Sequence, residues 1–374
     1  MVTLMSESSI VLTFSKLQDP RKQRNRLYTL DDLICTAILA TLCRCDDYDE
    51  ISDWTEGNLD WLQSLGLCME GAPSHDTYER FFRYLDSNHF QKCFLEWTAL
   101  LRGKIGGAIA IDGKTLRNAY DSATKPLHLV SAFATDNALV LGQVKTVGKG
   151  GELAGIQQLL DMLDLRGAVI TIDAAGCYKV ITEKVIEGKG DYVICLKGNQ
   201  GKLHDEAENF FAQVIEVDPE ESGCGYWKTE ETIRGRLDTR EVWTSDDIEW
   251  LPQRQEWAGL KSLVCVRRTT TEQGKERQQT RYFISSLSAD AAHQGQIIRG
   301  HWGIENRLHW QLDVTYREDL SRVRKGNGAE NLSVLRRATL NILRSDTSSK
   351  VSLKRRRFRA SLKRDYLCQL IGVN

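Results

Sequence analysis

Two short apolar runs that each end in an aspartate constrain the fold of this chain more than any other feature. Residues 105–111 lead to Asp112, in the sequence AIDGKT, and residues 168–172 lead to Asp173, in ITIDAAG. Short runs rich in Ile and Val are typical of buried strands. A carboxylate that follows such a strand is held at the rim of a sheet, where open α/β sheets collect their ligands.

The segments around these runs predict a mixed sheet covered by helices. Further strands are expected over residues 127–134, 138–147 and 191–196, and helices over residues 152–163 and 178–187. The order is therefore strand, strand, strand, helix, strand, helix, strand. A set that begins antiparallel and then alternates with helices predicts an α/β fold, with a mixed sheet flanked by helices.

The flanking regions differ in character. Residues 29–101 have apolar side chains at helical spacing and predict a helical N-terminal unit. Residues 229–243, 260–268 and 281–285 are rich in β-branched and aromatic residues and indicate a β-rich insertion. Helix is expected again over residues 289–312 and 328–343.

A third carboxylate lies on the first of these late helices. His301, Glu305 and His309 stand four residues apart, so a regular helix places them on one face. A glutamate on a mostly apolar helix is costly unless it has a partner. If Asp112, Asp173 and Glu305 converge, they repel one another unless a cation lies between them. Oxygen ligands suit magnesium, and two such ions can clamp the oxygens of a phosphodiester.

Other interpretations of these motifs stay open at this point. Asp112 and Asp173 could each cap a following turn, and Glu305 could form a structural hydrogen bond with a histidine. Gly113-Lys114-Thr115 resembles the end of a P-loop, but the required earlier glycine is Ala108, which argues against an ATPase. The two histidines and the glutamate could bind zinc, although their spacing differs from that of the zincin helix.

Charge is distributed unevenly along the chain. The net charge is −1, yet residues 317–374 contain fifteen Lys or Arg and only five Asp or Glu. A basic end on an acidic body is typical of a part that meets nucleic acid, although a solvated basic helix explains it equally well. Within residues 350–364, which contain no acidic residue, we predict DNA-backbone contacts by Arg355, Arg356 and Arg357.

Nothing in the sequence predicts a membrane protein or a secreted one. The longest strongly apolar stretch, residues 34–43, is too short to cross a bilayer, and the N-terminus has no signal-peptide pattern. The ten cysteines are scattered, without paired-ligand spacing. We therefore expect reduced thiols in a cytoplasmic, nucleoid-associated protein.

Several segments resemble bacterial insertion-sequence transposases of the H-repeat-associated, ISAs-type group. They are FSKLQDPRKQRNRLYTLDDLI, AIDGKTLR, HLVSAFATD, GELAGIQQLLDMLDLRGAVITIDAAGCYK, DYVICLKGNQ and RGHWGIENRLHWQLDVTYRED, and they cover nearly the whole chain. The resemblance implies an RNase H-like catalytic domain. It also implies that Asp112, Asp173 and Glu305 form the catalytic triad and hold two magnesium ions, for which manganese can substitute.

The chain departs from the family pattern near the glutamate. Related transposases carry a Tyr-Arg pair and a second Arg before it and a Lys after it. Here the corresponding positions hold Ile298, Arg299, His301 and Leu312, of which only Arg299 matches. Candidates for DNA contact are Lys114, Lys197, Arg299 and Trp302, the last by stacking on an unpaired base. Ion-paired or solvated roles for the basic residues, and a core role for the tryptophan, are the alternatives.

The resemblance implies a DDE transposase that cleaves DNA at element ends and joins the ends to target DNA. A nuclease without strand transfer and an immobile DNA-binding relic are the alternatives. The implied partners are double-stranded DNA and a second copy of the chain, assembled on DNA as a homodimer. We predict a helical DNA-binding or association domain (1–103), a catalytic core in two parts (104–221 and 288–345), a β-rich insertion (222–287) and a basic tail (346–374).

Overall fold

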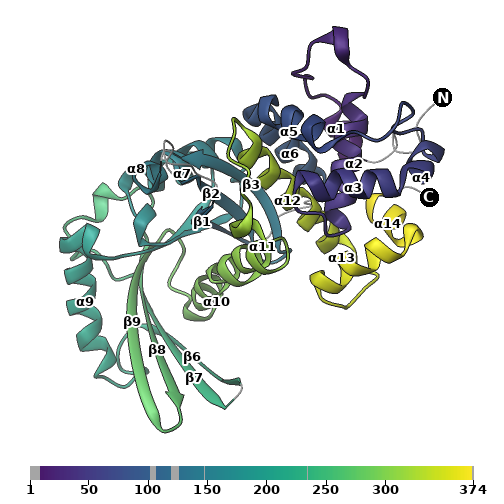
Figure 1. Ribbon diagram of the computed structural model, residues 1–374. Coiled ribbons are helices and arrows are strands. Elements are labelled where there is room, and N and C mark those ends of the chain that lie inside the picture. The colour runs from purple at the N-terminus through teal and green to yellow at the C-terminus, as the bar shows by residue number, and fades with distance from the viewer. Residues whose placement is uncertain (1–8, 102–106, 119–125, 147, 234, 373–374) are drawn as a thin grey trace.

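The computed structural model describes residues 9–101, 107–118, 126–146, 148–233 and 235–372. Within these ranges nine strands form one sheet in the order β3-β2-β1-β4-β5-β9-β8-β7-β6 (Figure 1). The strands are β1 (Ala108–Thr115), β2 (His128–Ala134), β3 (Leu139–Thr146), β4 (Val169–Ile172), β5 (Asp191–Cys195), β6 (Gly225–Ile233), β7 (Arg236–Ser245), β8 (Ser262–Glu272) and β9 (Lys275–Ser285).

The first five strands form a mixed sheet of the RNase H-like type. β1, β2 and β3 pair in antiparallel fashion, whereas β4 and β5 continue the sheet in parallel from β1. The predicted α/β fold class is confirmed. β9 then pairs antiparallel with β5, so the β-rich insertion extends the same sheet instead of forming a separate one.

Alternation along β1 assigns its side chains to two different cores. Ile109 and Ile111 pack with α7 (Glu152–Met162) and α8 (Lys179–Glu187) on one face. Ala108 and Ala110 face the other side, where α10 (Ala291–His301) and α12 (Gly328–Ser345) lie. Because successive side chains of a strand point to opposite faces, Asp112 belongs to the α10 side of the sheet.

The N-terminal helices share one core with the last helices of the chain. These helices are α1 (Ser9–Phe14), α2 (Leu30–Leu42), α3 (Tyr48–Gly57), α4 (Leu59–Ser64), α5 (His75–Tyr84), α6 (Ser87–Leu101), α12, α13 (Leu353–Leu362) and α14 (Arg364–Ile371). Figure 1 shows α12, α13 and α14 beside the purple and blue N-terminal helices. The expected basic tail therefore contains two helices that pack against the N-terminal unit. No helix in the described part of the chain is long and apolar enough to cross a membrane.

Three elements differ from their predicted form. Asp112 lies inside β1, because β1 keeps pairing with β2 through Thr115 after its pairing with β4 ends at Ile111; residue 105, the predicted start, lies outside the described residues. Residues 229–243, which were expected to be β-rich without further detail, form a hairpin of β6 and β7 that turns at Gly235, with a φ of 79°. Glycine adopts this left-handed conformation at little cost.

The third difference concerns the helix expected over residues 289–312. It is divided into α10, a π-helical turn at Ile304–His309 and α11 (Trp310–Val314). Such π-turns are rare and frequently mark functional sites. This one contains Glu305, the predicted third carboxylate.

Candidate active site

Strand geometry brings Asp112 and Asp173 to the same face of the sheet. Asp112 follows the last residue pair of β1 and β4, Ile111 with Ile172, and Asp173 directly follows that pair on β4. Thr171, two residues before Asp173, faces α10, where its hydroxyl lies 2.9 Å from Nδ1 of His301. Two neighbouring parallel strands therefore carry their carboxylates to one edge, as the sequence predicts.

Glu305 comes to this edge from the π-helical turn after α10. Glu305 is exposed to solvent, so the burial cost that we expected from the apolar helix does not arise. Together with Asp112 and Asp173, it lines a cavity of about 350 Å³. Asp173 is also exposed, whereas Asp112 is largely buried at the inner side of the group. The three carboxylates thus converge from two strands and one helical turn.

Asp112 has the electrostatic character expected of a crowded carboxylate. Burial, together with the nearby charges of Asp173, Glu305 and Glu152, raises its pKa to about 7, although a hydrogen bond from the backbone N–H of Gly113 acts in the opposite direction. Like charges and burial both favour the protonated form of a carboxyl group. Within the described residues, no Lys or Arg forms an ion pair with any of the three carboxylates of the cavity.

Two histidines flank the carboxylates in neutral form. Burial lowers the pKa of His301 to about 4 and that of His309 to about 3. Nδ1 of His309 lies 3.5 Å from Oδ2 of Asp112, so this contact is polar and not an ion pair at neutral pH. His301 lines the cavity and is oriented by Thr171, which the sequence pattern did not single out.

The donor set of the cavity fits a divalent cation. In the part of the chain that the structure describes, the three carboxylates face one space and form no ion pair with Lys or Arg, and a hard cation satisfies such oxygen ligands. A tighter group consists of His204, which also lines this cavity, with Asp205 and Glu208 on α9 (Gly201–Ile215). Its ligand atoms all lie within 4.8 Å of one another. The carboxylate oxygens of Asp112, Asp173 and Glu305 do not all lie within this distance of one another, as expected for like charges that face each other.

The ammonium group of Lys114 is already paired with carboxylates of the protein. It lies 2.7 Å from Asp313, 2.9 Å from Asp319 and 3.8 Å from Glu318, and the side chain is 7% exposed. This network joins β1 to α11 and to the segment that follows it. We therefore do not include Lys114 among the proposed phosphate contacts.

The other predicted contact residues near the carboxylates remain accessible. Lys197 is exposed and lines the cavity. Arg299 forms an ion pair of 2.5 Å with Glu231 of the insertion. Trp302 is 39% exposed and also lines the cavity, so it is not a core tryptophan. The guanidinium of Arg281 lies 4.6 Å from the centre of its ring. No sequence pattern singled out Arg281, because its position depends on the pairing of β9 with β5.

The three consecutive arginines of α13 have different environments. Arg355 is exposed. Arg356 donates to carbonyl oxygens at the end of α12, including that of Leu343 at 2.5 Å. Arg357 is 1% exposed and lies 2.5 Å from Asp46. Of the three, only Arg355 is available to bind a DNA phosphate, because the guanidinium groups of Arg356 and Arg357 form hydrogen bonds within the protein.

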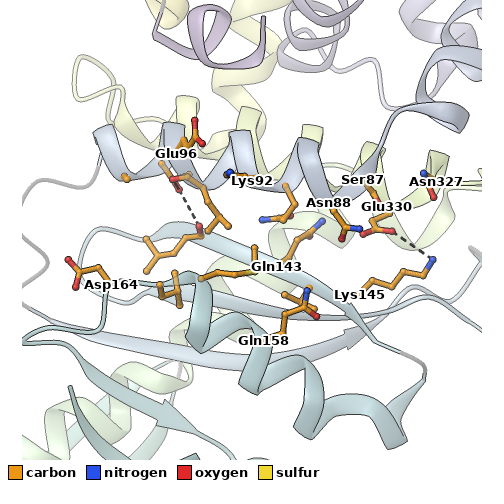
Figure 2. A pocket seen from close by; sticks show the side chains of 18 residues that line it. Ser87, Asn88, Lys92, Glu96, Gln143, Lys145, Gln158, Asp164, Asn327 and Glu330 are labelled. Carbon is orange, nitrogen blue, oxygen red and sulfur yellow. Dashed lines mark hydrogen bonds and ion pairs between the residues drawn. The ribbon is translucent and has the colours of Figure 1, made fainter. Parts of the chain in front are cut away.

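A larger cavity, of about 940 Å³, lies between α6, β3 and α7 (Figure 2). It contains none of the three carboxylates. Its charged groups include Lys145 and Glu330, which pair at 3.8 Å, and its inner wall contains the buried amides of Gln91 and Gln143. The catalytic candidates are therefore confined to the smaller cavity at the sheet edge.

Comparison with known proteins shows the family of this chain. The family model described as "Transposase DDE domain" matches residues 104–342, and the model described as "DDE_Tnp_1-associated" matches residues 11–98. The chain belongs to the DDE transposase family. The matched range includes Asp112, Asp173 and Glu305. Membership implies a role in DNA transposition, binding of DNA and use of a divalent metal.

Full-length relatives support this family assignment. The chain is 38% identical to "Putative transposase YncI" of Escherichia coli O157:H7 over 376 residues, which covers 98% of this chain and 95% of the relative. It is 37% identical to "H repeat-associated putative transposase YhhI" of Escherichia coli (strain K12), with 96% of each chain covered. The predicted resemblance to the H-repeat-associated group is thus confirmed.

A solved structure shows a weaker likeness. It is the "Cryo-EM structure of piggyBac transposase synaptic complex with hairpin DNA", with a TM-score of 0.45 and 12% identity. The alignment covers 99% of this chain and 80% of that chain.

Proposed function

We propose that this DDE transposase cleaves DNA at the ends of an insertion element and joins the freed ends to target DNA. The observation that carries the proposal is the convergence of Asp112, Asp173 and Glu305 on one solvent-accessible cavity. These residues would hold two magnesium ions, with manganese as a substitute. When bound, such ions lower the pKa of water and stabilise the charge that develops on a phosphodiester.

The proposed reaction has two displacements at phosphorus. In the first, water attacks the phosphate at the element end, the bond from phosphorus to the 3′ oxygen breaks, and a 3′-hydroxyl and a 5′-phosphate are left. In the second, the 3′-hydroxyl attacks a target phosphate and displaces the 3′ oxygen of the target strand. Each step breaks one P–O bond and forms another at the same phosphorus, so no nucleotide cofactor is needed.

The protein's own residues orient these steps. Asp112 is held by the backbone of Gly113, and Asp173 accepts a hydrogen bond of 3.0 Å from the N–H of Ala175, so both carboxylates have fixed positions. Lys197 at the rim would bind a phosphate of the incoming strand. The neutral His309 limits the space around Asp112. We further propose that a homodimer of the chain assembles on the two element ends.

The proposal is tested by incubating the protein with the DNA that flanks its own gene, in the presence of magnesium, and mapping all new ends. We expect 3′-hydroxyl ends at the element boundary and covalently joined products with an added target duplex. Cleaved ends without joined products would identify a nuclease instead. Binding with neither product would identify a DNA-binding relic.

Trp302 is predicted to stack on an unpaired base beside the cut. Stacking of a base on an aromatic ring contributes about 1–3 kcal/mol, so Trp302→Ala should lower the yield of processed ends with no loss of folded protein. Trp310, which is 54% exposed and lines neither this cavity nor its neighbour, provides the matched control. Equal end processing by Trp302→Ala and Trp310→Ala, measured on the same labelled ends, would contradict the stacking role.

A further inference from the structure

A second cavity, of about 450 Å³, adjoins the cavity of the three carboxylates. The two share Arg281 and Trp302 in their walls. Six arginines line this second cavity, against two carboxylates, Glu231 and Asp238. We call it the arginine groove, and its arginines are Arg236, Arg240, Arg268, Arg281, Arg299 and Arg307.

Strand register explains why so many arginines meet there. Arg236, Asp238 and Arg240 alternate along β7 and therefore point to one face of the insertion. Arg268 of β8 lies directly opposite Arg240, and directly opposed like charges destabilise a sheet. The same face packs against α10, which adds Arg299. The arrangement is costly for the isolated fold, and a bound anion would offset that cost.

Asp238 holds two of the arginines in place. It is 1% exposed and accepts hydrogen bonds from Thr270 at 2.7 Å, from Arg268 at 3.0 Å and from Arg236 at 2.9 Å. Burial alone would raise the pKa of Asp238, but these hydrogen bonds outweigh it and lower the pKa to about 2. Asp238 is thus a positioning residue, fully occupied by the protein.

Glu231 is differently placed. It pairs with Arg299 at 2.5 Å and with Arg240 at 3.8 Å, and its side chain is 31% exposed. Nη1 of Arg240 and Nε of Arg236 are shielded from solvent and have no hydrogen-bond partner among the described residues. The partly exposed carboxylate of Glu231 therefore lies between the guanidinium groups of Arg299 and Arg240, and these two shielded N–H groups form no hydrogen bond with the described residues.

We infer that the arginine groove binds the sugar–phosphate backbone of one DNA strand next to the cut, and that Glu231 occupies a phosphate position in the free protein. Guanidinium groups bind phosphates through charge-assisted, often bidentate hydrogen bonds. Displacement of Glu231 by a phosphate would satisfy Arg299 and Arg240 together. Trp302 lines both cavities, so a strand bound in the groove would pass along this side chain to reach the carboxylates. The inference rests on the proposed function and extends it to a defined surface.

Two substitutions that remove charges of opposite sign test the groove. Affinity for a fluorescent single-stranded oligonucleotide is measured by anisotropy over a range of salt, with EDTA present so that metal binding plays no part. Arg240→Gln should weaken binding several-fold and reduce the salt slope by about one. Glu231→Gln should tighten binding, because it removes the competing carboxylate. Arg166→Gln, which removes an exposed arginine outside the groove, is the control and should leave affinity unchanged.

Two results would overturn the inference. One is weaker or unchanged binding by Glu231→Gln. The other is an Arg240→Gln variant that binds like the Arg166→Gln control. A blunt duplex should respond less to both substitutions than the single strand does, and a response confined to the duplex would also contradict the one-strand assignment. If Arg240→Gln fails to fold, Arg299→Gln, which removes the other guanidinium that pairs with Glu231, provides the same comparison.

The outcome separates this inference from the proposed function. A groove that binds as expected in a protein that never cuts DNA would reject the proposed chemistry and keep the binding site. Normal cutting and joining with no effect of Glu231 or Arg240 would reject the groove and keep the chemistry.

Discussion

Asp112→Asn is expected to reduce metal-dependent DNA cleavage by about 10³-fold or more while DNA binding remains nearly unchanged. The substitution keeps the shape of the side chain and removes one anionic ligand. Metal ions contribute several kcal/mol to such a transition state, and about 1.4 kcal/mol corresponds to tenfold in rate. The variant should also be at least as stable as the wild type, because it relieves the repulsion among three carboxylates.

Glu152→Gln is the matched control for this variant. Glu152 also raises the pKa of Asp112, but it lies on α7 and does not line the cavity. It should leave cleavage near the wild-type rate, whereas Asp173→Asn and Glu305→Gln should resemble Asp112→Asn. Rates are measured on a labelled element end in single-turnover conditions. Normal magnesium-dependent cleavage by Asp112→Asn would remove this residue from the active site.

Arg357→Ala is expected to lower the free energy of unfolding by about 3–5 kcal/mol, the usual cost of breaking a buried ion pair by removing one partner. The guanidinium of Arg357 lies 2.5 Å from Asp46, donates to the carbonyl of Thr41 at 2.6 Å and stacks on Tyr316 at 4.1 Å from the ring centre. Its removal leaves the carboxylate of Asp46 buried beside a cavity. Denaturant unfolding followed by tryptophan fluorescence measures the change.

Arg355→Ala provides the control two residues earlier on the same helix. Arg355 is exposed, so its removal should change stability by no more than about 0.5 kcal/mol. If α13 contacts DNA, Arg355→Ala should weaken binding to all duplexes similarly, since phosphates carry little sequence information. Equal stability of the two variants would show that the buried contacts of Arg357 contribute nothing to the fold.

The sequence predicted the core strands well because their signals are local. The apolar run before Asp173 became β4, with the aspartate immediately after it. The two apolar runs predicted that both aspartates lie at the rim of the sheet, whereas their common face follows from the register that pairs Ile111 with Ile172. The bounds of β1 were harder to predict, because they depend on its pairing with β2, a partner that the run itself does not specify.

The remaining features depend on contacts between distant segments. A helical repeat does not reveal the π-turn that presents Glu305, because the turn is set by packing around Ile304 and Leu308, which are fully buried. Dense positive charge predicts a surface helix, yet Arg357 is buried because Asp46, more than 300 residues earlier, lies beside it. The arginine groove likewise requires the register of three strands, which no local pattern gives.

The location of a bound metal tests the central claim most directly. Anomalous diffraction from crystals grown with manganese and an element-end DNA would place each ion on named ligands. The account predicts manganese between Asp112, Asp173 and Glu305, and loss of that signal in Asp112→Asn. Manganese bound only at His204, Asp205 and Glu208, with none at the three carboxylates, would contradict it.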